Sequence, residues 1–144
     1  MTSNSNEQNL PLGVSFSGKT GTIGVYSSTA ESITLCILDD EEALTVKKTV
    51  ELERGHNNEW WASSTALKPG TKYALRATGP EGPLHAFNPS LNLIDPYAKA
   101  VSRDSAREYH CVAIKEDFDW DGVAKPDTPL DQTIVYEAHA RGLT

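Results

Sequence analysis

Short runs in which apolar and polar residues alternate dominate the pattern of this chain. In the run at 33–38, Ile33, Leu35 and Ile37 lie on one face of an extended chain and Thr34, Cys36 and Leu38 on the other, so both faces of this strand are fairly apolar. Turn-forming residues separate such runs at intervals of about 8–12 residues. Strands are therefore predicted at 22–26, 33–38, 60–63, 73–77 and 109–114, with one more that contains Leu44, Val46, Val50 and Leu52. No helical period of useful length occurs, so the pattern predicts an all-β sandwich.

Residues 79–96 interrupt the alternation. This stretch contains Pro80, Pro83, Pro89 and Pro96, and proline both lacks a backbone donor and restricts the residue before it. We therefore expect mostly irregular structure here. Asp95 followed by Pro96 is typical of a capped first helical turn, so a single helical turn is expected at that point.

Another apolar, β-prone run occupies 134–140, very close to the last residue. A finished domain rarely stops where a new buried strand begins. The run therefore indicates a piece of a longer protein, whose function would be the function of its parent.

Several short motifs follow one another in order along the chain. They are Pro11-Leu12-Gly13; Tyr73, Arg76, Gly79 and Pro80; Phe87-Asn88-Pro89; Asp95-Pro96-Tyr97-Ala98; Phe118-Asp119-Trp120; and Pro129, Thr133, Ile134, Tyr136, Glu137, His139, Arg141 and Gly142. In this order they resemble the N-terminal region of bacterial glycogen debranching enzymes and isoamylases, within glycoside hydrolase family 13. The ordered set covers nearly the whole chain, and that makes it far more specific than any single tripeptide.

The resemblance implies a fold and a division of the chain. It implies an immunoglobulin-like β-sandwich, classed as a family 48 carbohydrate-binding module, ahead of a (β/α)₈ catalytic barrel. The expected parts are a disordered tail at 1–10, the sandwich at 11–116, a linker at 117–133 and the first barrel strand, truncated, at 134–144. The family's catalytic carboxylates come from later barrel strands, so no catalytic residue is expected here. Glu137 is then a structural residue of the first strand.

Charge and hydropathy limit the kinds of binding partner and the cellular location that are expected. The chain has 13 basic and 20 acidic residues, a net charge of −7, and this argues against nucleic acid. No apolar run is long enough for a membrane span. The N-terminal residues lack the features of a signal peptide, so a cytoplasmic protein is expected and a stand-alone adhesion domain is disfavoured.

Other candidate sites have simpler explanations. The segment 117–122 imitates a calcium loop, but Thr128 stands where the bidentate glutamate belongs, so we expect solvated carboxylates with Phe118 and Trp120 packed on the sandwich. The histidines are scattered singly, and no cofactor or metal site is expected. Cys36 and Cys111 are expected as buried free thiols, with a disulfide between them left open.

Sugar binding depends on aromatic rings, because pyranose faces stack on them. Trp60 and Trp61 are adjacent in a strand and must point to opposite faces. By the resemblance Trp60 is the core residue, which leaves Trp61 either as a substrate-binding platform or as a contact for the barrel. Glycogen-binding members of the family carry a lysine where this chain has Ala74, and a tryptophan in the next loop, absent at 79–85.

The sequence thus predicts the N-terminal, non-catalytic module of a debranching enzyme. The parent would hydrolyse α-1,6 branch links in glycogen or limit dextrin, with its own barrel as the module's partner. The alternative is a glycogen-binding or scaffolding module without hydrolase function.

Overall fold

The computed structural model describes residues 11–40, 45–103 and 108–143. The expected tail at 1–10, Leu44 and Thr144 lie outside these ranges. The strands are β1 Gly13–Ser17, β2 Thr20–Tyr26, β3 Ser32–Leu38, β4 Val46–Glu51, β5 Glu53–Arg54, β6 Glu59–Ser64, β7 Lys72–Thr78, β8 Ala100–Arg103 and β9 Tyr109–Val112. Three single-turn 3₁₀ helices complete the set: η1 His56–Asn58, η2 Leu130–Gln132 and η3 Ala140–Gly142.

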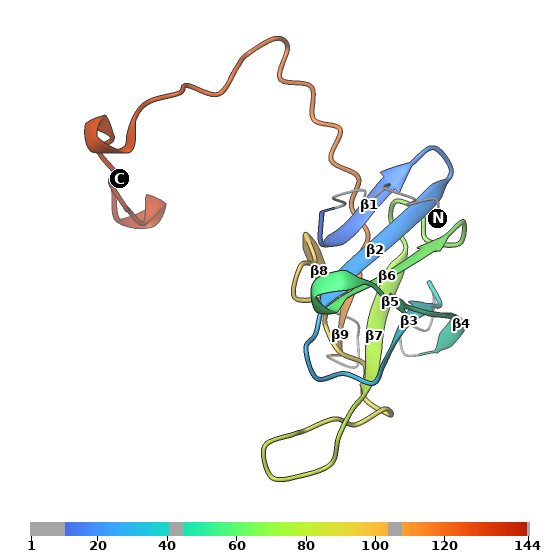
Figure 1. The fold of residues 1–144 in the computed structure, drawn as a ribbon. Coiled ribbons are helices and arrows are strands. Elements are labelled where there is room, and N and C mark those ends of the chain that lie inside the picture. Colours follow the sequence, from blue (N-terminus) through green and yellow to red (C-terminus); the bar gives the residue numbers. More distant parts are fainter. Residues whose placement is uncertain (1–10, 41–44, 104–107, 144) are drawn as a thin grey trace, which may run out of the picture.

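The strands form two antiparallel sheets (Figure 1). One sheet has the order β1-β2-β6-β5, and the other has the order β4-β3-β7-β9-β8. Apolar residues of both sheets, such as Ile23 and Trp60 from the first and Leu35 and Tyr73 from the second, belong to one buried cluster. The predicted all-β sandwich is confirmed.

Alternation in the sequence explains how this core is built. In β3, Ile33, Leu35 and Ile37 are 4%, 0% and 5% exposed and all belong to the common core. Burial of each such side chain contributes roughly 1.5–3 kcal/mol relative to exposure. The strands that the pattern missed are β1, β5 and β8, which are short or lie at sheet edges, where alternation is weak.

The proline-rich segment is attached to the second sheet by a buried carboxylate. Asp95 is 1% exposed, and its Oδ2 accepts a 2.8 Å hydrogen bond from the Tyr73 hydroxyl. Its Oδ1 accepts from the Tyr97 backbone N–H at 2.8 Å, and its own N–H donates to Cys111 Sγ at 3.2 Å. Asp95 thus caps a single turn, which the Ala98 N–H closes on the Asp95 carbonyl. Burial raises the pKa of Asp95 above its usual range, although these hydrogen bonds oppose the shift.

The two cysteines are buried and free. Cys36 pairs across the sheet with Ala74, whereas Cys111 pairs with Tyr73, the residue just before Ala74 in β7. Cross-strand partners share a face and successive residues alternate, so the two thiols project from opposite faces of one sheet. A disulfide between them is therefore excluded, and burial raises the pKa of both, that of Cys111 to about 11.

The C-terminal segment 115–143 differs from the sequence prediction. No strand forms at 134–140, where Ile134, Val135 and Tyr136 are 95%, 83% and 82% exposed. A strand needs a neighbour for its backbone groups, and this segment extends away from both sheets (Figure 1). Phe118 and Trp120 do not pack on the sandwich either, because they are 74% and 68% exposed. Their rings contact each other edge-to-face, with 4.8 Å between the ring centroids.

Candidate functional site

Trp60 and Trp61 project from opposite faces of β6, as predicted. Trp60 is 4% exposed and belongs to the core. Its Nε1 donates to the Ser27 carbonyl at 3.0 Å, and the Arg54 guanidinium lies 5.5 Å from its ring. Trp60 is therefore a structural residue with its polar atom satisfied.

Trp61 lies on the outer face of the four-stranded sheet and is only partly exposed. It pairs with Gly24 of β2 on one side and Glu53 of β5 on the other. A Cβ placed on Gly24 would meet ring atoms Cζ3, Cη2 and Cε3 at 2.0, 2.4 and 2.5 Å. If this Cβ lay in the plane of the ring, beyond its edge, it would be much farther from Cη2 and Cε3 than from Cζ3. The three nearly equal distances instead place it over the face of the ring. The indole therefore lies face-down on Gly24, and its other face is directed away from the sheet.

Polar side chains surround this ring on the same face. Thr22 and Tyr26 lie two residues from Gly24 along β2, and Glu59 and Ser63 lie two residues from Trp61 along β6, which puts all four on the Trp61 side. The Thr22 and Ser63 hydroxyls are 2.9 Å apart and hydrogen-bonded, and Tyr26 is 51% exposed. A flat ring bordered by hydroxyl and carboxylate groups can stack on a pyranose and hydrogen-bond its hydroxyls. We call this set, with Glu53, the Trp61 face.

Sequence reasoning found Trp61 but missed the residues that position it. The signal was Gly24, between Ile23 and Val25 in β2. A glycine inside a strand often marks a close approach by another group, and here that group is the Trp61 ring. Without the pairing register, nothing in the sequence connects Gly24 to Trp61.

The position of the family's usual lysine offers no binding group. Ala74 is fully buried and packs with Cys36 and Leu38 on the outer side of the five-stranded sheet. In the following loop, Leu84 is 92% exposed but carries no aromatic ring. The structure thus supports the Trp61 face over that position.

The remaining candidate groups do not converge. Glu137 is exposed, as are His56, His85 and His139, whereas His110 is buried. Asp119 Oδ1 accepts from the Asp121 N–H at 2.8 Å. In the ranges that the structure describes, no three His, Cys, Asp or Glu side chains are placed to share a metal ion. Nor does any helix within those ranges have the length and hydropathy that spanning a lipid bilayer requires.

Comparison with known proteins identifies relatives. Glycogen debranching enzymes of Yersinia enterocolitica and Pectobacterium atrosepticum are each 33% identical to this chain over 155 aligned positions. These alignments cover 93% of the chain but only 23% of each relative.

Solved structures show the same fold. Ligand-free PulA from Klebsiella pneumoniae superposes with a TM-score of 0.60 at 21% identity, covering 74% of this chain and 10% of that one. A pullulanase from Bacillus acidopullulyticus gives 0.58 at 19% identity, covering 73% and 12%. The family described as carbohydrate-binding module 48 (isoamylase N-terminal domain) matches residues 11–98. This chain therefore belongs to the carbohydrate-binding module 48 family.

Proposed function

We propose that this chain serves as the N-terminal, non-catalytic module of a glycoside hydrolase that debranches α-glucans. In the parent, the reaction would be hydrolysis of α-1,6 links in glycogen or limit dextrin. The family match and the curated relatives named glycogen debranching enzyme support this proposal. The chain spans about a quarter of those relatives, so the hydrolytic activity belongs to the proposed parent.

The module's own contribution is a weak α-glucan contact at the Trp61 face. The observation that carries this proposal is the Trp61 ring lying flat on Gly24, with its other face directed outward beside hydroxyl groups. Fixing the ring in advance reduces the conformational entropy that a sugar would otherwise have to remove. A single shallow platform supports an affinity of roughly millimolar, about −4 kcal/mol.

The C-terminal segment supplies the connection to the parent's barrel. We propose residues 117–133 as a linker and 134–144 as the first barrel strand, which forms only when its neighbours are present. The exposed apolar side chains of Ile134, Val135 and Tyr136 support this, because a barrel strand buries such side chains. A cytoplasmic location stays a prediction.

An activity assay tests the non-catalytic role. The isolated chain is expected to release no reducing sugar from glycogen, limit dextrin or pullulan, because hydrolysis needs a pair of carboxyl groups flanking the bond. Turnover by the pure chain that disappears in Glu137→Gln would contradict the structural role of Glu137.

A titration with maltoheptaose, followed by two-dimensional NMR, tests the glucan contact. We expect roughly millimolar binding with shifts at the Trp61 indole N–H. Trp61→Ala should abolish the binding, and Trp61→Phe, which retains a ring over Gly24, should keep part of it. Binding that is unchanged in Trp61→Ala would exclude the platform and favour a role for Trp61 in packing against the barrel.

A further inference from the structure

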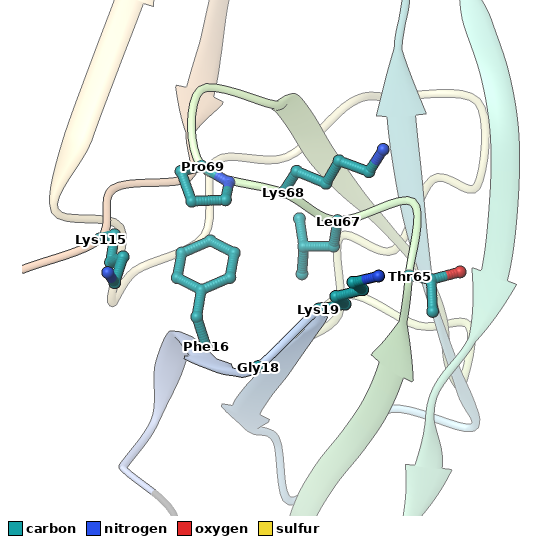
Figure 2. Close-up of a pocket in the computed structure, with 8 residues that line it drawn as sticks. All are labelled: Phe16, Gly18, Lys19, Thr65, Leu67, Lys68, Pro69 and Lys115. Carbon is teal, nitrogen blue, oxygen red and sulfur yellow. The ribbon is translucent and has the colours of Figure 1, made fainter.

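A second candidate site, which shares no residue with the Trp61 face, is a hollow at one end of the sandwich. Three segments border it: the β1–β2 hairpin, the loop between β6 and β7, and the chain just after β9 (Figure 2). The hollow has a volume of about 830 Å³, ample for a hexose unit. Nothing in the family motifs uses the side chains that line it.

The floor of the hollow is apolar. Phe16 is only partly buried, and its ring rises from β1 toward Pro69, with Leu67 beside it (Figure 2). Leu67 is fully buried and anchors the loop in the core, so this floor is held in place. At the hairpin, Gly18 has φ +58° and open space over its backbone. Phe16 packs against the core on one side and lines the hollow with the rest of its ring, which is the part that a stacking contact would use.

The rim of the hollow is cationic, in a chain whose net charge is −7. Lys19 and Lys68 lie on the Thr65 side of the Phe16 ring, and Lys115 lies on the other side (Figure 2). Lys115 is 3.4 Å from Asp117. Neither Lys19 nor Lys68 forms an ion pair with any carboxylate of the described residues. In this view Leu67 stands between the Phe16 ring and the ammonium groups of Lys19 and Lys68, and Thr65 lies beyond them on the same side (Figure 2).

We propose that this hollow binds a hexose phosphate, with the sugar on Phe16 and the phosphate at Lys19 and Lys68. A phosphate monoester carries about −1.5 to −2 charges at pH 7, close to the charge of these two lysines. Its oxygens accept charge-assisted hydrogen bonds from ammonium and hydroxyl donors. A neutral glucan would leave both lysines uncompensated. An acidic peptide would satisfy the lysines, but it makes less use of the ring in a carbohydrate-binding family.

The ligand has two sources with the same chemistry. One is a free hexose phosphate, and the other is a glucose unit of an α-glucan that carries a phosphate monoester. The hollow is open, so both can enter. The proposal does not depend on the Trp61 face, because the two surfaces share no residue.

The test is an NMR titration of the full chain at low salt, with glucose 6-phosphate, phosphorylated maltodextrin, glucose, inorganic phosphate and a short glutamate peptide as separate ligands. We expect saturable shifts at Lys19, Thr65 and Lys68 with the two sugar phosphates, and much weaker responses to the other three. If glucose 6-phosphate and phosphorylated maltodextrin bind equally, the site recognises a single phosphorylated glucose unit from either source. If only one of them binds, that compound represents the natural ligand. Equal binding by inorganic phosphate or by the peptide would overturn the sugar assignment.

Variants complete the test. The double variant Lys19→Ala/Lys68→Ala should weaken glucose 6-phosphate binding by roughly fivefold or more. Phe16→Leu, which keeps an apolar residue on the core, should weaken it while leaving the inorganic phosphate response unchanged. Lys48→Ala, at an exposed position of the edge strand β4, is the charge-matched control and should have no effect.

An equal loss of binding in Lys48→Ala, or no loss in the double variant, would contradict the site. Trp61→Ala should leave this binding intact, so failure here and failure of the maltoheptaose contact are distinguishable.

Discussion

Two apolar, β-prone runs of this chain have opposite fates. In β3, Leu35 is fully buried and lies between paired residues of β4 and β7. At 134–136, side chains of the same kind are at least 82% exposed and pair with no strand of the described chain. Local β propensity is similar in the two runs. Partners on both sides decide which run becomes a strand, because backbone groups must find donors and acceptors.

This difference also divides function between the regions. Both proposed binding surfaces are built on the paired strands and their connecting loops, where packing fixes the positions of Trp61 and Phe16. The segment 117–143 carries exposed apolar groups instead, such as Phe118, Trp120 and Ile134. Substitutions in the two regions should therefore affect stability very differently.

The largest difference in stability between the two regions is expected when one apolar side chain in each is replaced by alanine. Leu35→Ala should lower the free energy of unfolding by about 2–5 kcal/mol, because it removes a fully buried side chain and leaves a cavity. Ile134→Ala should change it by less than about 0.5 kcal/mol, because the side chain is almost fully exposed. Urea unfolding followed by tryptophan fluorescence measures both. Comparable losses would mean that residues 134–136 pack on the sandwich in solution.

Removing one tyrosine hydroxyl group should also lower the free energy of unfolding more in the sandwich than in the C-terminal segment, but the difference should be smaller. Tyr73→Phe deletes the donor at 2.8 Å from Asp95 and leaves a buried carboxylate oxygen unsatisfied, at a cost of about 1–3 kcal/mol. Tyr136→Phe removes an exposed hydroxyl and should be neutral. Equal stability of the two variants would show that water replaces the Tyr73 hydroxyl at Asp95.

The pH dependence of stability should show a smaller effect still. Burial raises the folded-state pKa of Asp95, so the folded protein holds more protons than the unfolded chain between the two pKa values. The contribution of Asp95 to stability therefore falls as pH rises from the unfolded value of about 3.9 through the raised folded value. In Asp95→Asn this slope should disappear, whereas Asp131→Asn, in the exposed segment, should retain it. If the stability difference between the wild type and Asp95→Asn rose with pH in this range, instead of falling, the dominance of burial would be contradicted.

Alternation was enough to predict the central strands and the sandwich, because the core-facing residues of β3 and β7 recur at every second position, even though Cys36 and Ala74 are buried on the outer face as well. The edge strands β1 and β8 were not predicted, since apolar and polar residues need not alternate regularly in an edge strand. No strand forms at 134–140 in this structure, because β propensity alone does not supply a neighbouring strand for the backbone groups to pair with.

The sites were less predictable than the fold. Trp61 could be singled out, since adjacent residues of a strand face opposite ways. Its support by Gly24 depends on the register of β2 against β6, which the sequence does not state. The hollow joins Phe16, Lys68 and Lys115, which lie far apart along the chain and meet only through the sandwich topology.

The most direct test of this account is to end the chain after Asp127 and compare its thermal unfolding and maltoheptaose binding with those of the full chain. The account predicts cooperative unfolding at nearly the same temperature, unchanged shifts at Trp61, and less self-association where the full chain shows any. A shortened chain that fails to fold, or that loses the Trp61 response, would contradict the claim that the sandwich is a self-sufficient carbohydrate-binding module.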